Sequence, residues 1–128
     1  MRLLFDTHAL LWWMTGERAI TATAEAAILD EHNEKIVSAA SAWEISIKFN
    51  LGKLPGAGPF LADFHGHLAR QGFTSLPMSV AHGLAAGALP LLHRDPFDRM
   101  LIAQALTEQL MLLSNEAAFD AYGVGRFW

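Results

Sequence analysis

Four acidic residues stand next to short apolar runs in separate parts of the chain. They are Asp6, Glu44, Asp98 and Glu116. Two unit charges ~4 Å apart repel by about 4 kcal/mol at an effective dielectric constant of about 20, so carboxylates that gather in space need a cation between them. Oxygen ligands suit Mg²⁺ or Mn²⁺ better than Zn²⁺. Such a site can activate water and hold a phosphodiester for in-line attack.

The elements that would position these acids alternate along the chain. Short apolar runs without period-2 alternation are typical of strands buried on both faces, and longer runs have helical spacing. Strand followed by helix, repeated, predicts an α/β fold in which a short central parallel sheet forms the middle of a three-layer α/β/α sandwich. We expect one domain over residues 1–128, with strands at 3–5, 36–37, 111–113 and 124–127 and helices at 7–14, 21–31, 41–51, 59–70, 79–88 and 96–109.

The predicted sheet brings the acids to one place. Ligands of parallel α/β sheets bind in the crevice beyond the carboxyl ends of the strands. Asp6, Glu44 and Glu116 each follow a predicted strand, and Asp98 begins the helix before the third one. The topology therefore predicts a single acidic cluster at that end of the sheet.

Each acidic segment also fits a helix start, and that alternative stays open. Asp6 or Thr7 could cap the first helix, because Asp and Thr are favoured at that position. Ser41 and Glu44 have the spacing of a capping box. The other candidate helix starts are Asp95-Pro96-Phe97-Asp98 and Ser114-Asn115-Glu116, the latter with Asp120 one turn on.

Composition limits the classes of function. The chain has no cysteine, which excludes disulfides, a thiol nucleophile and zinc held by thiolates. Nine basic against thirteen acidic residues give a net charge of −4, so only a local basic patch or a metal could hold a phosphate. Polar residues at 6–8 interrupt the apolar opening, and no other stretch approaches the ~20 apolar residues of a membrane span, so we expect a soluble cytoplasmic protein without membrane contact.

Four blocks of sequence in this order are similar to a known family. They are Leu3-Leu4-Phe5-Asp6-Thr7-His8, Ala39-Ala40-Ser41-Ala42-Trp43-Glu44-Ile45, the run from His93 to Ala105, and Leu112-Leu113-Ser114-Asn115-Glu116. Over essentially its whole length the chain resembles the PIN domain family, and within it the VapC-type toxins of type II toxin–antitoxin systems.

The resemblance implies a metal-dependent endoribonuclease that is selective for single strands. Metal-activated water would hydrolyse RNA phosphodiester bonds and leave a 5′-phosphate and a 3′-hydroxyl. The family's Mg²⁺- or Mn²⁺-binding acids carry over onto Asp6, Glu44 and Asp98. The fourth is usually an aspartate, and the matching residue here is Glu116. Residues that would orient these ligands or a bound water are Thr7, Asp95, Ser114, Asn115 and Asp120.

The resemblance also implies partners. A toxin of this kind would cleave RNA, form a homodimer and bind a cognate VapB-type antitoxin. Candidates for contact with RNA phosphates are Arg94, Arg99 and Lys48. Lys48 has an alternative role, because Glu44 and Lys48 have the i, i+4 spacing of a helical ion pair.

Other readings remain beside the enzyme. A catalytically weak PIN fold could act only as a binding scaffold, an option that Glu116 raises. A response-regulator receiver has a similar size and sheet, but it needs an acid pair near the first strand and a lysine after a late strand, and this chain has neither. His8 and His93 lie near the predicted cluster, and Trp12 and Trp13 are expected mainly in the core.

Overall fold

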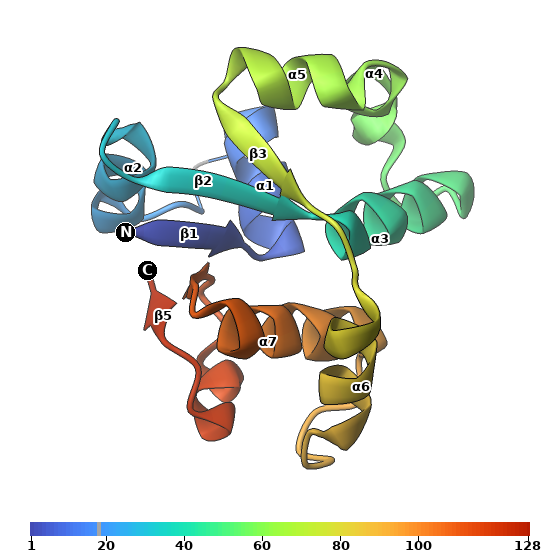
Figure 1. The fold of residues 1–128 in the computed structure, drawn as a ribbon. Coiled ribbons are helices and arrows are strands. Elements are labelled where there is room, and N and C mark those ends of the chain that lie inside the picture. Colours follow the sequence, from blue (N-terminus) through green and yellow to red (C-terminus); the bar gives the residue numbers. More distant parts are fainter. Residues whose placement is uncertain (18) are drawn as a thin grey trace.

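Five strands form a parallel sheet in the computed structural model, which describes residues 1–17 and 19–128. They are β1 (Arg2–Phe5), β2 (Glu34–Ser38), β3 (Phe73–Leu76), β4 (Met111–Leu113) and β5 (Arg126–Phe127). The strand order is β3-β2-β1-β4-β5, and every pairing is parallel (Figure 1). The carboxyl ends of all five strands therefore lie along one edge of the sheet.

Helices cover both faces of this sheet (Figure 1). The α-helices are α1 (Thr7–Thr15), α2 (Ala22–Leu29), α3 (Ala39–Asn50), α4 (Gly58–Ala62), α5 (Phe64–Arg70), α6 (Val80–Ala88) and α7 (Pro96–Glu108), with 3₁₀ turns η1 (Pro55–Ala57) and η2 (Ala117–Tyr122). Residues of α1 to α5 share one apolar core, whereas α7 and η2 contribute to the other and α6 packs on α7. The predicted three-layer α/β/α sandwich is confirmed.

The central strand shows why the short apolar runs form strands. Leu3, Leu4 and Phe5 are all fully buried, although side chains of a strand alternate between its two faces. Leu3 and Phe5 belong to the core under α1 to α5, and Leu4 belongs to the core under α7. A strand covered on both faces cannot alternate apolar with polar residues, so its sequence is continuously apolar.

Three expectations about the elements were wrong. The strand β3 was missed, because Thr74 and Ser75 are exposed on this edge strand and break the apolar run used to find buried strands. The single helix expected at 59–70 is two helices, since Asp63 has non-helical dihedral angles of φ −139° and ψ 55°. The capping box of Ser41 and Glu44 does not exist, because α3 begins at Ala39 with Ser38 as its N-cap.

The helices of residues 1–17 and 19–128 show no membrane-crossing segment. None of those in the described part of the chain combines the length and the apolar character that a bilayer crossing needs.

Candidate active site

Asp6 lies at the carboxyl end of β1, where its backbone N–H donates to the Leu113 carbonyl of β4 at 3.0 Å. Its carboxylate is buried, and Oδ2 accepts a 2.7 Å hydrogen bond from Ser114 Oγ. Oδ1 accepts a longer bond of 3.3 Å from the His8 N–H, so Asp6 is also the N-cap of α1, as the capping alternative predicts. Burial raises the pKa of Asp6, and the bond from Ser114 opposes that rise.

Glu44 lies in the second turn of α3 and is 2% exposed. Its Oε2 accepts a 2.7 Å hydrogen bond from Lys48 Nζ one turn later, which confirms the predicted helical ion pair. Within the described residues its Oε1 has no hydrogen-bond partner. A buried polar atom without a partner costs about 1–3 kcal/mol, so a cation bound to this oxygen would remove that cost.

Asp98 lies in the first turn of α7, and its Oδ2 is 2.7 Å from His93 Nε2. Burial raises the pKa of Asp98 to about 6, despite the opposing bond from His93. The negative charges of Asp95, Asp6 and Glu44 also raise this pKa. Asp6 follows β1, Glu44 lies in the helix that follows β2, and Asp98 lies at the start of the helix that precedes β4, so all three segments lie toward the carboxyl edge of the sheet.

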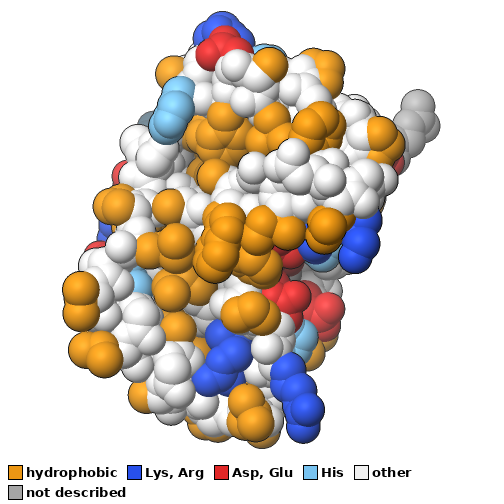
Figure 2. Space-filling view, turned by 90° about the vertical axis from the view of Figure 1, so that its right-hand side faces the viewer, with side chains coloured by type: hydrophobic (Ala, Val, Ile, Leu, Met, Phe, Trp, Pro, Cys, Tyr) orange, Lys and Arg blue, Asp and Glu red, His pale blue; other side chains and the backbone are white. Residues whose placement is uncertain are grey.

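Lys48 sits among these acids. The hydrogen bond to Glu44 is the largest cause of a raised Lys48 pKa, and the charges of Asp95 and Asp98 add to it. On the face where α3 and α7 approach, Figure 2 shows acidic side chains gathered with basic and histidine side chains around them. The cluster is thus partly neutralised by the protein's own donors.

The donor set fits a hard divalent cation. Carboxylate oxygens are the ligands that Mg²⁺ and Mn²⁺ prefer, and burial raises the pKa of two of these acids, Asp6 and Asp98. Across residues 1–17 and 19–128, no three or more acidic or histidine side chains stand in an ion-binding geometry. Each of the three acids accepts a hydrogen bond from a donor of its own, Ser114 for Asp6, Lys48 for Glu44 and His93 for Asp98.

A comparison with family models adds to this geometry. The model described as "PIN domain" matches residues 3–125. The chain belongs to the PIN domain family.

Similar proteins carry names that bear on function. Ribonuclease VapC16 of Mycobacterium tuberculosis is 40% identical over 57 residues, which are 44% of this chain and 40% of that protein. The match thus spans less than half of either protein.

Two solved structures share the fold along nearly the whole chain. VapBC2 from Rickettsia felis, solved bound to a DNA fragment from its promoter, has a TM-score of 0.74 at 13% identity and covers 99% of this chain and 98% of that one. VapBC-1 from nontypeable Haemophilus influenzae has a TM-score of 0.68 at 14% identity, covering 99% and 97%. At these identities the likeness shows a shared PIN fold.

Glu116 is placed differently from the other three acids of this PIN domain. Its exposed carboxylate accepts from the Ala118 N–H at 3.3 Å and caps η2, as the helix-start alternative predicts. Its charge is not among those that raise the pKa of Asp6 or Asp98, but it does contribute to a raised pKa of Arg126. The expected role of Glu116 as a fourth metal ligand stays a prediction.

Four residues expected to orient ligands have varied surroundings. The Thr7 and Ser41 hydroxyls are 2.9 Å apart and buried, which ties α1 to α3 beside Asp6 and Glu44.

Asp95 is the N-cap of α7, accepting from the N–H groups of Phe97 and Asp98. Asn115 is exposed, and Asp120 forms a two-point ion pair with Arg126 at 2.7 and 3.0 Å.

The two arginines expected to contact phosphate differ sharply. Arg99 uses both terminal nitrogens to donate to four backbone carbonyls, those of Ala86, Leu89, Pro90 and His93. This structural role is at odds with phosphate binding. Arg94 is exposed, has no side-chain hydrogen bond in the described part of the chain and lies in the loop next to Asp95.

His93 is a residue whose role sequence reasoning missed. It precedes Asp98 by five positions, a spacing that no helical rule connects, because the intervening Asp95 begins a helix. The only indication in the sequence that His93 could act at this site was its position near the predicted cluster of acids.

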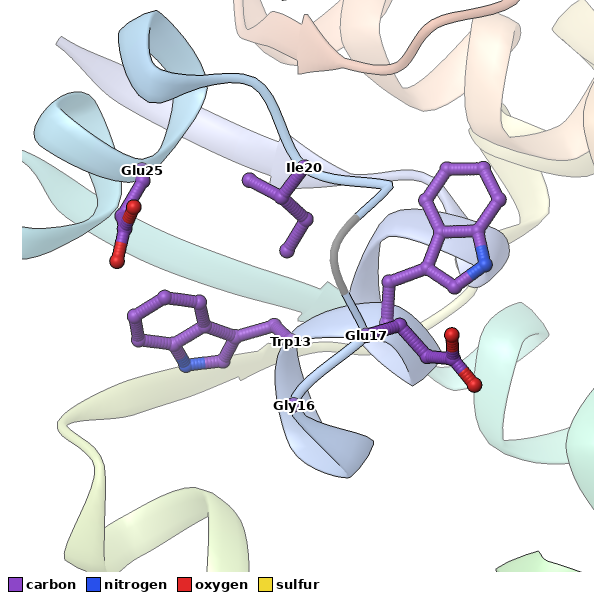
Figure 3. Close-up of a pocket in the computed structure, with 6 residues that line it drawn as sticks. Trp13, Gly16, Glu17, Ile20 and Glu25 are labelled. Carbon is purple, nitrogen blue, oxygen red and sulfur yellow. The ribbon is translucent and has the colours of Figure 1, made fainter.

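The two tryptophans of α1 have different surroundings. Trp13 packs against the core and donates to Gln71 Oε1 at 2.8 Å, so its predicted core role is confirmed. The Trp12 ring lies 5.9 Å from that of His8 and 5.8 Å from that of Trp128. Together Trp12 and Trp13 line a cavity of about 270 Å³ between α1 and α2, which Figure 3 shows with Glu17, Ile20 and Glu25 around it.

Proposed function

We propose that this PIN domain is a metal-dependent endoribonuclease and the toxin of a toxin–antitoxin pair. The observation that carries the proposal is the placement of three acids in segments at the carboxyl edge of the sheet, with one buried Glu44 oxygen unpartnered in the described residues. Family membership and the partial similarity to Ribonuclease VapC16 support a nuclease.

Asp6, Glu44 and Asp98 would hold Mg²⁺ or Mn²⁺. When bound, such an ion lowers the pKa of a water molecule and stabilises charge that develops on phosphate oxygens. The chain's own groups prepare the ligands: Ser114 holds one oxygen of Asp6, and Lys48 holds one oxygen of Glu44. Each acid thereby keeps a second oxygen for the ion. Glu116, which caps η2 through one oxygen, is the candidate for a fourth ligand.

The substrate strand would be held by local positive charge, because the whole chain carries a net charge of −4. Arg94 is the leading candidate for a phosphate contact, since it is exposed beside Asp95 and Asp98. Lys48 is the second, but a phosphate would compete for its ammonium with Glu44. Arg99 contributes indirectly by holding the segment that leads to Arg94. These contacts recognise a nucleic-acid backbone and not a base sequence.

The proposed partners are a VapB-type antitoxin and a second copy of the chain. The support is the shared fold with two VapBC structures over nearly the whole chain. Co-expression with the antitoxin, followed by co-purification, tests the first partner, and light scattering of the free chain tests the second.

The deciding experiment is cleavage of a labelled structured RNA by purified protein with Mg²⁺, Mn²⁺ or EDTA. The proposal expects metal-dependent product with a 5′-phosphate, lost in Asp6→Asn and kept in the matched control Asp30→Asn, an exposed aspartate paired with His32. Metal binding without cleavage of any RNA tested would favour the scaffold alternative. Equal cleavage by Asp6→Asn and wild type would refute the site.

A further inference from the structure

The side chain of His93 is placed against Asp98 by a short hydrogen bond. Nε2 of His93 is 2.7 Å from Oδ2 of Asp98, and the two side chains are 29% and 19% exposed. An ionised carboxylate only accepts hydrogen bonds, so Nε2 carries the proton and donates it. The contact therefore gives Asp98 one fixed oxygen.

His93 is itself held on both sides of its backbone. Its N–H donates to Tyr122 Oη at 2.8 Å, and Tyr122 Oη donates to the Pro90 carbonyl at 3.0 Å. Its carbonyl accepts from Arg99 at 3.2 Å. The imidazole also meets the Phe119 ring edge to face at 5.7 Å. With the backbone and ring both restrained, the direction of Nε2 is set before any ligand arrives.

The same pattern occurs at all three acids of the cluster. Ser114 donates to Oδ2 of Asp6, Lys48 to Oε2 of Glu44 and His93 to Oδ2 of Asp98, each at 2.7 Å. The second oxygen is held weakly at Asp6, by a 3.3 Å bond, and has no hydrogen bond in the described part of the chain at Glu44 or Asp98. One oxygen of each acid is anchored, and the other is left for a ligand.

We propose that His93 is a positioning residue that holds Asp98 for binding of a divalent cation. The imidazole fixes Oδ2, which restricts rotation of the carboxylate and reduces the conformational entropy lost when Oδ1 binds the ion. This inference rests on the proposed function only in requiring a divalent cation at the acid cluster.

The test measures metal affinity without relying on catalysis. Thermal unfolding of the full chain is followed while Mn²⁺ or Mg²⁺ is titrated, and the metal concentration at half of the maximal stabilisation is compared among variants. Loss of a residue that orients a metal ligand costs ~10–100-fold in affinity, so His93→Ala is expected to raise that concentration by this factor. His93→Gln keeps an N–H donor and is expected to recover part of the loss.

A matched control is the histidine–aspartate pair at the opposite end of the sheet. His32 Nδ1 is 3.0 Å from Asp30 Oδ1, just before β2. His32→Ala removes the same kind of contact, and its metal response is expected to equal that of wild type. RNA cleavage measured over the same metal range is expected to shift in parallel for His93→Ala.

A second variant covers the case in which His93→Ala does not fold. Tyr122→Phe removes both hydrogen bonds of Oη and keeps the imidazole, so a smaller shift in the same direction is expected. A wild-type midpoint in His93→Ala, or in Tyr122→Phe if the first variant is unfolded, would overturn the role of His93. No metal response in wild type would overturn the metal site, and His93 with it.

Discussion

Replacing Asp98 with Asn is expected to stabilise the metal-free protein at neutral pH. Burial raises the pKa of Asp98 to about 6 from an ordinary value of 3.8. Between these pH values the folded state binds more protons than the unfolded state, so stability falls as pH rises through the window. Above about pH 6 the folded chain carries the full cost of ionising Asp98. Asparagine has no charge and keeps an oxygen that can accept from His93.

The size of the gain follows from the pKa. The difference between 3.8 and about 6 corresponds to about 3 kcal/mol at 1.36 kcal/mol per pH unit. The Asp98 side chain is 19% exposed, and solvent screening lowers the figure, so we expect about 1–3 kcal/mol. With an unfolding entropy of about 2.1 cal/mol/K per residue over 128 residues, this gain corresponds to a Tm increase of about 4–11 °C.

The assay is thermal and urea unfolding of wild type and Asp98→Asn in EDTA from about pH 4 to pH 8. The difference in unfolding free energy is expected to be near zero at the acid end, to grow up to about pH 6 and to stay constant above it. Asp30→Asn is the opposing control, because a hydrogen bond from the His32 backbone is the main cause of a lowered Asp30 pKa. The reasoning would be refuted if Asp98→Asn were no more stable than wild type above pH 6.

Four further predictions concern the same site. Mg²⁺ or Mn²⁺ at about 100 times its Kd is expected to stabilise wild type by about 2.7 kcal/mol and to leave Asp98→Asn nearly unchanged, as thermal titration would show. Arg99→Ala is expected to cost about 2–4 kcal/mol in urea unfolding, because four carbonyls lose their donor. Arg94→Ala is expected to keep stability within about 0.5 kcal/mol of wild type and to weaken RNA binding with a shallower salt dependence; unchanged binding would contradict its assignment. Glu116→Gln is expected to retain cleavage within about tenfold of wild type, whereas Asp6→Asn loses about 100-fold or more, and equal losses would return Glu116 to the cluster.

Much of the architecture was determined by local sequence patterns. Leu3, Leu4 and Phe5 are continuously apolar because two layers of helices cover their strand, so the burial of this strand can be predicted from its residue types. The edge strand β3 lacks such an apolar run, because one of its sides has no neighbouring strand and Thr74 and Ser75 are exposed to solvent. The amino-terminal limits of α1 and α7 were predicted correctly from Asp6 and Asp95, which cap them through bonds to nearby N–H groups.

The sequence by itself also determined which acids could meet. In a parallel sheet, residues that follow strands share one edge, and this rule places Asp6 and Glu44 together without knowledge of any distance. It could not separate Glu116, which follows a strand as well, from these two. Asp6 and Glu116 both cap the helical turn that follows them, and an N-cap is worth only about 1 kcal/mol, so capping does not separate the two acids.

Only the tertiary structure decided how each acid is used. Ser114 bonds to Asp6 across 108 positions of sequence, and the hydroxyls of Thr7 and Ser41 meet across 34. Such contacts depend on distances created by the packing of whole elements, so no local pattern records them. Secondary-structure propensity reflects the free energy of a residue and its near neighbours in sequence. The hydrogen-bond partner of a buried carboxylate depends instead on all the elements that pack around it.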